Sequence, residues 1–574
     1  MNNSAGSGKD NAIFATALVF AAFVGFFLRW YLLRDQVLLD DEWHGLFYAI
    51  GRSPVWLLTH FSVPGATCIP LNVYTWALGG TFGWSEMGLR LPSLVCGLLC
   101  VIVCPLLARD VIGIRQAAWL ALLLAISPIL IYYSRSARPY SPVAFLGFVA
   151  ILCAARWARA GTWQWGALYV ITSILAIYFH LFAIITVLVP ALSAIVCLLY
   201  ALSFKKTSNI LPPLSHWLIA VAIIIVFSSL LLLPAIIHSW GGTFSQVIQS
   251  TSFKIQSLPI AMTLIAGTAQ PVPVVLFWIM LVVGAVAQCR KNPWFGGTLV
   301  SLYLFHVLAL VILHPDSVGV PLVMVRYSIP LVPVSLLLVA GGIQFVLETL
   351  GQRTGFHPQL QALVAFACAV ALILAGPLPQ IYSAPNNFTN HGAYQQRYGP
   401  MDWSHSFYSD FIPPELGRQT AVRAEDVSAF YRNLGNTRDE HPLVEYPMML
   451  GDHFNPLYYY QYFHRRPVLV GYETDVNALG SLASGKVYGN NYVDHVLSLV
   501  SDPSRLRFRN LVSMEDLSAM RVRGVTYIVL HKRYESELYH IAPPMPDLPR
   551  LYQEYSQKIG PPFYEDVNIV VFKL

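Results

Sequence analysis

Charged residues are scarce in this sequence. Asp, Glu, Lys and Arg together make up 11% of its 574 residues, whereas hydrophobic residues make up 56% and the mean hydropathy is +0.55. A water-soluble domain has about a quarter of its residues charged. The composition therefore excludes a chain surrounded mainly by water, and it indicates that lipid is the solvent of most of the molecule.

Cysteine is rare too, and its positions exclude two kinds of site. All eight cysteines lie within or beside apolar segments, and none follows Cys368. The pattern provides neither a disulfide framework nor a Cys-x-x-Cys metal motif. Cys96, Cys100 and Cys104 recur every four residues on one face of an expected helix. We interpret them as small residues at a helix contact, with redox chemistry as the alternative.

Clusters of basic residues and metal-binding spacings are also missing. The net charge is only +6, and no Lys/Arg run is interleaved with aromatic residues, which argues against a nucleic-acid partner. No histidine pair has the spacing of a zinc site. We therefore predict no resident metal and no required cofactor. A divalent cation on Asp41 and Glu42 remains an alternative, although such ions usually take more oxygen ligands than these two residues provide.

What the sequence has in abundance is long apolar runs. From about Ile13 to about Leu378 they recur at close to the roughly 20 residues that cross a bilayer. We predict a polytopic α-helical membrane domain over residues 1–382, with about eleven spans. The expected spans are 13–33, 90–108, 116–133, 142–158, 163–180, 183–202, 214–237, 271–288, 296–313, 327–348 and 361–380.

The composition changes after this region. Residues 383–574 carry dense Asp, Glu, Arg, Tyr and Pro and no spanning run, which indicates a soluble second domain. Strand-like runs alternate with helical ones there, so we predict a small α/β fold. The strand-like runs are 441–447, 466–472 and 524–531, and the helical ones are 415–434 and 512–522. We interpret the sequence His464-Arg465-Arg466 as a solvated turn, with capture of an anionic acceptor as the alternative.

An odd number of spans puts the two chain ends on opposite sides of the membrane. If the N-terminus is cytoplasmic, most short inner loops hold Lys or Arg pairs, as the positive-inside rule favours. The first apolar run has no small-residue cleavage site and is expected to stay as a span. These features predict a plasma (inner) membrane protein with an extracytoplasmic C-terminal domain. Residues 34–89 are expected to form helices along the outer interface.

Three adjacent carboxylates, Asp40, Asp41 and Glu42, follow the first span. They repel one another, so ionising all three is costly unless a cation or a proton-donating substrate lies nearby. A carboxylate in such a partly apolar site is suited to act as a general base toward an acceptor hydroxyl. The alternative is a solvated loop that caps the following helix.

Arginines gather at the same predicted membrane face. Arg135 and Arg138 follow the third span and Arg326 lies at the tenth, with Tyr140 and Tyr327 close by in sequence. Guanidinium groups bind phosphate oxygens in a bidentate manner, and tyrosine hydroxyls add donors, so these residues are candidates for a lipid-linked phosphate site. Snorkelling arginines and an interfacial aromatic belt are the alternative. Their concentration on the face opposite the positive-inside bias favours the phosphate site.

Two histidines near span ends, His60 and His180, are further candidates. A single histidine at such a place is more often an interfacial group with its hydrogen bonds satisfied than a ligand. We therefore favour structural roles for both.

Four segments, taken in order, resemble a known family. They are the acidic pair after the first span, "FGWSEMGLRLPSLVCGLL", "YSRSARPY" and "RYSIPLVP". Together they are similar to the integral-membrane glycosyltransferases of the GT-C fold, in the bacterial branch related to protein O-mannosyltransferases and the lipid A aminoarabinose transferase. The resemblance runs from about Ile13 to Gln344. The sequence "GATCIPLN" departs from the family, since many relatives have a His- or Lys-containing "PPL" segment there.

The resemblance implies an inverting transferase that moves a hexose or pentose from a polyprenyl-phosphate donor, at the extracytoplasmic side. The family's acidic pair falls on Asp41 and Glu42, which makes Asp41 the expected base, and its phosphate-binding arginines correspond to Arg138 and Arg326, with Arg135 less certain. A protein, a lipid A-like glycolipid and a cell-wall glycan all remain as acceptors.

Other functions fit part of the pattern. A transporter or flippase for a lipid-linked or anionic solute would also hold charges near the membrane. Such proteins usually show internal repeats, and the sequence has none that we detect. A polysaccharide ligase or polymerase would share the phosphate-binding arginines and differ in its donor.

Overall fold

The computed structural model describes a large part of the chain. The described ranges are 4–31, 52–61, 68–82, 85–204, 211–239, 255–268, 270–315, 318–319, 321–354, 427–437, 443–446, 463–464, 468–472, 475–479, 514–522, 524–532 and 548–574, with residues 33, 42, 45, 49, 378, 441 and 466. The chain divides into two compact units, one of residues 1–31, 53–73 and 90–379, and the other of residues 32–52, 74–89 and 380–574. The prediction that the domains divide at residue 382 is not decided by this grouping.

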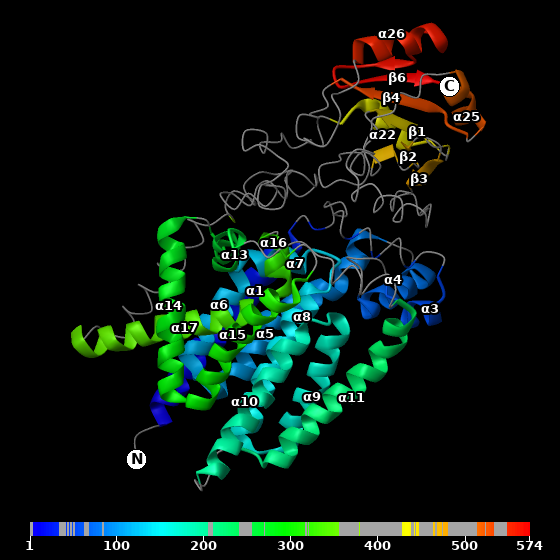
Figure 1. Ribbon diagram of the computed structural model, residues 1–574. Coiled ribbons are helices and arrows are strands. Elements are labelled where there is room, and N and C mark those ends of the chain that lie inside the picture. The colour runs from blue at the N-terminus through cyan, green and yellow to red at the C-terminus, as the bar shows by residue number, and fades with distance from the viewer. Residues whose placement is uncertain are drawn as a thin grey trace. The chain divides into compact units, whose positions relative to one another are not determined.

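Helices make up the first unit (Figure 1). Those that lie in it wholly or in large part are α1 (Ser4–Trp30), α3 (Pro54–Thr59), α5 (Glu86–Ile112), α6 (Ile114–Ile126), α7 (Pro128–Ser134), α8 (Tyr140–Ala160), α9 (Trp163–Phe179), α10 (Ala183–Ser203), α11 (Leu214–Ser239), α13 (Ser257–Ala266), α14 (Pro271–Lys291), α15 (Pro293–Leu313), α16 (Pro321–Tyr327) and α17 (Leu331–Thr354). The helix α4 (Ile69–Thr81) belongs partly to each unit.

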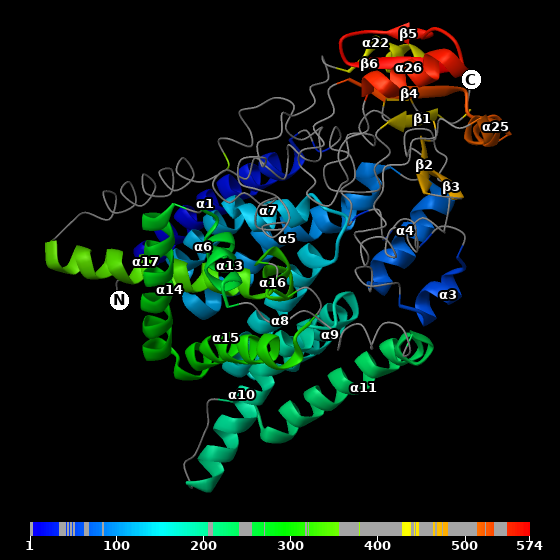
Figure 2. The same cartoon turned by 45° about the horizontal axis from the view of Figure 1, so that its top comes forward.

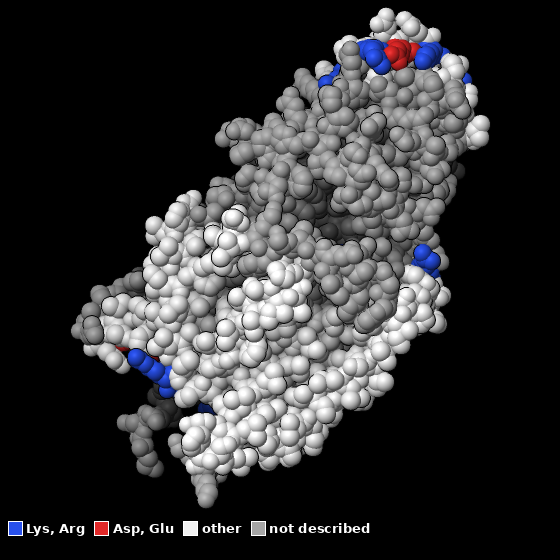
Figure 3. Space-filling model, viewed as in Figure 1, with Lys and Arg blue, Asp and Glu red and all other residues white. Residues whose placement is uncertain are grey.

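The prediction of a polytopic helical membrane protein is confirmed. Among the described residues, eight helices are long and apolar enough to cross a bilayer, and a ninth span results if α6 and α7, bent by 58°, count as one. The helix α9 forms where a span was expected but is shorter than these eight, and the expected span 361–380 falls almost wholly outside the described residues. On the face shown in Figure 3, few charged side chains interrupt the described surface of the helices.

Glycines allow two of the long helices to approach closely. The helices α14 and α17 cross in Figure 1, and their backbones meet at Gly284 and Gly342. A Cβ at Gly284 would overlap the carbonyl oxygen of Leu338, and one at Gly342 would overlap that of Met280. Since lipid gives helices no hydrophobic drive to associate, such close backbone packing is a main source of their affinity.

A six-stranded mixed sheet forms in the second unit. Its order is β3-β2-β1-β4-β6-β5, with β1 parallel to both β2 and β4 and the other pairs antiparallel. The strands are β1 (Leu443–Tyr446), β2 (Val468–Tyr472), β3 (Asp475–Leu479), β4 (Tyr527–His531), β5 (Tyr564–Glu565) and β6 (Ile569–Lys573). All three predicted strand runs are present as β1, β2 and β4.

Helices pack on both faces of this sheet. Alternate residues of β4 and β6 point to opposite sides, as the pleat requires. Ile528 and Phe572 pack with residues of α25 (Met514–Val522) and α26 (Leu548–Lys558), while Val529 and Val571 pack with residues of α22 (Ala429–Gly435). Figures 1 and 2 show α26 alongside β4 and β6. The α/β character predicted for this region is present in its described part.

The predicted solvated turn at His464-Arg465-Arg466 is wrong for two of its residues. His464 and Arg466 are each 1% exposed, and Arg465 is outside the described part. His464 Nε2 lies 3.6 Å from Oε1 of Glu445, and Oε2 of the same carboxylate accepts a 2.8 Å hydrogen bond from the Tyr431 hydroxyl. Burial holds the pKa of His464 below its usual value, although the Glu445 carboxylate acts in the opposite direction. The burial of His464 could not be predicted from its neighbours in sequence, because the carboxylate beside it, Glu445, lies about twenty residues earlier on β1.

Asp566 organises the connection between β5 and β6. Its carboxylate accepts hydrogen bonds from Ser428 Oγ at 2.6 Å, Tyr564 Oη at 3.0 Å, and the backbone amides of Asn568 and Ile569 at 2.8 and 2.9 Å. Burial raises the pKa of Asp566, but these donors outweigh it and leave the pKa lowered. The carboxylate therefore ties α22 to the β5–β6 hairpin.

We predict that Gly284→Ala separates α14 from α17. The added methyl group meets backbone, which cannot move aside as a side chain can, so thermal unfolding in detergent should show a loss of about 1–3 kcal/mol. Gly297→Ala on α15 is the matched control, because nothing lies within 4 Å of its added Cβ. Equal losses in both variants would contradict the close packing of these helices.

We predict that Asp566→Asn destabilises the sheet by about 1–3 kcal/mol at neutral pH, because four partly buried donors lose a charged acceptor. Since the folded pKa is lowered, the stabilisation is complete above the usual Asp pKa of about 4 and is lost as the pH falls through the folded value. Amide exchange of β4 and β6, corrected for intrinsic rates, measures this. The difference between wild type and variant should vanish at low pH.

Glu554→Gln serves as the control for that experiment. Its exposed pair with Arg550, at 2.9 Å, contributes less than about 1 kcal/mol. An effect at Glu554 as large as that at Asp566 would contradict the assignment.

Candidate functional site

A tight turn after α7 presents the first of the predicted arginines. The preceding span is broken because Pro128 begins α7 without an N–H to continue α6. The turn packs against α5: Ser93 Oγ donates to the carbonyl of Arg138 at 2.8 Å, and Ser141 Oγ donates to the carbonyl of Ser93 at 2.8 Å. A Cβ at Gly97 would overlap Ser134 Oγ, so only glycine allows α5 this near.

The structure brings Arg138 and Arg326 together around one aromatic ring. The Arg138 guanidinium carbon lies 5.7 Å from the centroid of the Tyr140 ring, and that of Arg326 lies 5.6 Å from the same centroid. Arg138 is 6% exposed and Tyr140 is also 6% exposed. The negative face of an aromatic ring attracts cations, which allows two like charges to share a partly dry site. The cluster is therefore electropositive and suited to an anion.

Tyr133 is a member of this cluster that the sequence analysis missed. Its hydroxyl accepts a 3.3 Å hydrogen bond from Nε of Arg326, and its ring lies 4.7 Å from that of Tyr140. This bond joins α7 to α16, which lie at one end of the helical unit (Figure 1). Tyr133 is the first residue of the quoted segment "YSRSARPY", but the sequence analysis gave it no role, because it lies in the mainly apolar run that ends α7.

His180 and Tyr327 extend the cluster. The His180 ring lies 6.0 Å from the Tyr140 ring and 5.9 Å from the Tyr327 ring. His180 ends α9, where its Nδ1 accepts a 3.3 Å hydrogen bond from the amide of Phe182. The ring of Phe182 in turn packs 5.2 Å from that of Tyr327. Four of the predicted residues thus lie beside or around Tyr140, although they come from separate parts of the chain.

Arg135 is oriented differently from Arg138. It is fully buried, and its Nη1 donates to backbone carbonyls of Leu28, Arg29 and Tyr31 at 3.4, 3.1 and 2.8 Å. These carbonyls belong to the C-terminal end of α1. This geometry favours a structural use of the guanidinium over the phosphate contact expected from the sequence.

His60 lies in a setting of its own. It ends α3, with Nδ1 3.1 Å from the carbonyl of Trp56 and 3.0 Å from the hydroxyl of Thr59. Its ring stacks on Trp56 at 4.5 Å and lies 4.7 Å from that of His238. These contacts describe a helix-end histidine between α3 and α11.

The predicted acidic residues are described only in part. Asp40 and Asp41 lie outside the described residues, while Glu42 is 2% exposed and belongs to the second unit. A general base among these three residues therefore stays a prediction from the sequence. Within the described part of the chain, no three His, Cys, Asp or Glu side chains form a group that could hold a metal ion.

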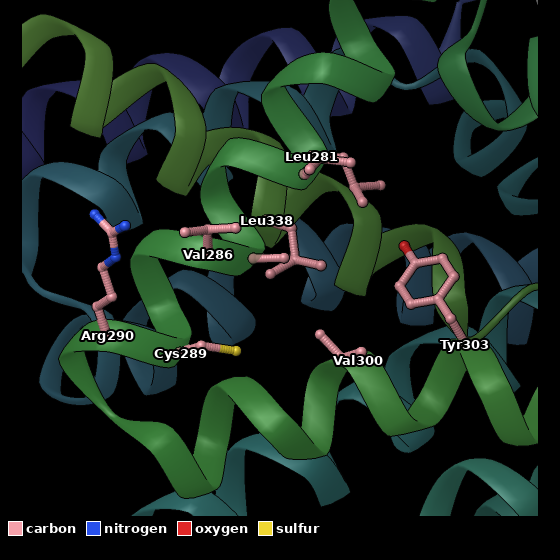
Figure 4. Close-up of a pocket in the computed structure, with 9 residues that line it drawn as sticks. Leu281, Val286, Cys289, Arg290, Val300, Tyr303 and Leu338 are labelled. Atoms are coloured by element: carbon pink, nitrogen blue, oxygen red, sulfur yellow. The ribbon is translucent and has the colours of Figure 1, made fainter.

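A groove of about 520 Å³ lies elsewhere in the helical unit, between α14, α15 and α17. Figure 4 shows Arg290 at one end of it and the Tyr303 hydroxyl at the other, with Leu281, Val300 and Leu338 between them. The lining is almost entirely apolar, as expected for a hollow between membrane spans. None of its lining residues belongs to the cluster of Arg138, Arg326, Tyr133 and Tyr140, so we do not place the functional site in this groove.

Comparison with known families agrees with the resemblance seen in the sequence. The family described as dolichyl-phosphate-mannose-protein mannosyltransferase matches residues 70–232. This segment includes the arginine turn, Tyr140 and His180. The resemblance to protein O-mannosyltransferases that the sequence shows is thereby confirmed over these residues. The matched segment is less than a third of the chain, and no curated protein matches the chain.

Solved membrane transferases show a looser likeness to this chain. Apo ArnT from Cupriavidus metallidurans is 15% identical with a TM-score of 0.49, over 99% of this chain and 98% of that one. Mycobacterial arabinofuranosyltransferase AftD is 13% identical with a TM-score of 0.44, over 92% and 37%. Archaeoglobus fulgidus oligosaccharyltransferase AglB, in complex with an inhibitory peptide and a dolichol-phosphate, is 14% identical with a TM-score of 0.37, over 90% and 69%. Similarities this distant assign no role to any residue.

We predict that Tyr140→Leu destabilises the helical unit, whereas Tyr140→Phe does so much less. Leucine removes the ring that both guanidinium groups contact, and each cation–π contact contributes about 0.5–2 kcal/mol, whereas phenylalanine keeps the ring. Thermal unfolding in lipid nanodiscs measures the difference. Equal stability of the two variants would show that the ring does not hold the arginines.

Proposed function

We propose that the protein is an inverting glycosyltransferase that takes a hexose or pentose from a polyprenyl-phosphate donor at the extracytoplasmic face. The observation that carries the proposal is the shared contact of Arg138 and Arg326 with the Tyr140 ring. Two guanidinium groups in a partly dry site suit a phosphodiester anion, because each can bind phosphate oxygens through two N–H groups. The family match, whose description names a dolichyl-phosphate sugar, supports a lipid-linked donor.

In this mechanism the arginines bind the donor phosphate and stabilise it as a leaving group. An acceptor hydroxyl oxygen attacks the anomeric carbon from the side opposite the phosphate oxygen. The bond from the hydroxyl oxygen to the anomeric carbon forms as the bond between that carbon and the phosphate oxygen breaks. The electron pair of the broken bond leaves with the polyprenyl phosphate. Asp41 takes the hydroxyl proton, with Glu42 and Asp40 beside it in sequence.

The acceptor is a hydroxyl of a glycolipid, a protein or a cell-wall glycan. Tyr327 and His180 border the arginine cluster and are proposed to contact the sugar or its phosphate. The predicted C-terminal domain, residues 383–574, is proposed to be extracytoplasmic, where it would be available to the acceptor.

The test is a transfer assay with purified protein in lipid, polyprenyl-phosphate sugars and envelope lipids or peptides as acceptors. Arg138→Ala and Arg326→Ala should each raise the donor KM by about tenfold to a hundredfold, since a charged hydrogen bond contributes about 1.5–3 kcal/mol. Lysine variants should recover only part, because the bidentate geometry is lost. Arg115→Ala, which breaks only an exposed 3.2 Å pair with Asp10, is the control.

The base role is tested separately. Asp41→Asn should lower kcat by about a hundredfold to ten-thousandfold while donor binding persists, because asparagine cannot accept the proton. Unchanged transfer by Asp41→Asn would remove it as the base. Movement of intact lipid-linked sugar across the bilayer, without release of polyprenyl phosphate, would replace the transferase with a flippase.

A further inference from the structure

The break between α6 and α7 leaves carbonyl groups that need donors. In an unbroken helix the Leu124 carbonyl would accept from the amide of residue 128, but Pro128 has no N–H. The Leu124 and Ala125 carbonyls lie in the last turn of α6, within an apolar bundle. Water cannot reach such groups in lipid, and an unmet carbonyl there costs several kcal/mol.

Arg29 of α1 supplies the missing donors. Its Nη2 lies 3.1 Å from the Leu124 carbonyl and its Nη1 lies 3.0 Å from that of Ala125. Its Nε donates to Ser134 Oγ at 3.1 Å, at the other end of α7. The side chain is 1% exposed. One guanidinium therefore joins the end of α6 to the end of α7 and fixes the bend between them.

Arg135 in turn supplies hydrogen-bond donors to the C-terminal end of α1. The helix α1 ends at Trp30, and Nη1 of Arg135 donates to the carbonyls of Leu28, Arg29 and Tyr31. A helix C-terminus carries a partial negative charge, so a buried cation is favoured there. Arg29 thus satisfies carbonyls at the end of α6, and Arg135, which follows α7, satisfies those at the end of α1, so a shift of α1 against α6 and α7 would break both sets of bonds.

The hydrogen bonds of Arg29 and Arg135 fix the turn that carries Arg138. Within it, the amide of Arg135 donates to the Tyr132 carbonyl at 3.0 Å, and the amide of Arg138 donates to the Ser136 carbonyl at 2.8 Å. Arg138 comes three positions after Arg135 in the chain, and Tyr140 comes two positions after Arg138. The position of the Arg135 backbone therefore limits where the Arg138 guanidinium and the Tyr140 ring can lie.

We propose that Arg29 and Arg135 are positioning residues for the lipid-phosphate site, because they lock the α7 turn so that Arg138 and Tyr140 meet Arg326. The proposal rests on the proposed function, since it names what places that site. It assigns Arg135 to the backbone of α1 and not to the phosphate. A misplacement of about 1 Å at such a site reduces function by up to about a hundredfold.

The experiment compares Arg29→Gln, Arg29→Lys, Arg135→Gln and Arg135→Lys with Lys291→Gln. Lys291 is the control because its Nζ also donates to a carbonyl at the end of a span, that of Ile112 at the C-terminal end of α5, at 2.7 Å. The measurements on each full-length protein in nanodiscs are binding of undecaprenyl phosphate, the donor KM, the acceptor KM, kcat, thermal stability, and amide exchange of residues 134–141.

Both glutamine variants should bind undecaprenyl phosphate and donor about tenfold to a hundredfold more weakly, with faster exchange in the turn and an acceptor KM within about twofold of wild type. The lysine variants should recover part of the binding, since an ammonium still donates to a carbonyl. Lys291→Gln should lower thermal stability without changing donor binding or exchange in the turn.

The two possible failures look different. Wild-type binding and turn exchange in a folded Arg135→Gln variant, while Arg138→Ala binds weakly, would overturn the positioning role alone. Weaker binding in Lys291→Gln equal to that in Arg135→Gln would also overturn it, because a general loss of stability would then suffice. If Arg138→Ala binds undecaprenyl phosphate as wild type does, the proposed phosphate site fails, and the positioning role fails with it.

Discussion

Backbone carbonyl groups inside a membrane need partners from the protein itself, and this constraint explains the most unusual feature of the helical unit. Pro128 interrupts one span, and α1 ends beside it, so two sets of carbonyls come together without their own helical donors. Arg29 and Arg135 meet them. Burying two guanidinium groups is costly. The cost is offset by many hydrogen bonds per cation and by the partial charges at the helix ends.

The same break produces a short turn, and the turn produces the cluster around Tyr140. Arg138 reaches the ring from the turn, and Arg326 reaches it from α16 while donating to Tyr133. A strained or broken helix in a membrane is stable only where the surrounding protein satisfies its backbone. Stability and chemistry therefore depend on the same few bonds, and the proposed phosphate site is built on the part of the bundle that most needs external donors.

The second unit stabilises its carboxylates with specific donors. Glu445 is buried beside His464, whereas Asp566 lies near the surface and accepts hydrogen bonds from four donors. In both places a carboxylate gathers groups from distant segments. The second unit thus combines specific polar bonds with two apolar cores, whereas the helical unit combines them with close backbone approach at glycines such as Gly284.

The sequence by itself determined the membrane class, most spans and the strands β1, β2 and β4, because apolar length and alternation are local properties of the chain. It also selected Arg138, Arg326, Tyr140 and His180 as residues of interest. Only the tertiary structure decided that these four lie together, that Tyr133 joins them and that Arg135 faces backbone carbonyls. Those outcomes depend on contacts between separate segments, several of them more than a hundred residues apart, such as that of Arg326 with Tyr133, and no local pattern encodes such contacts.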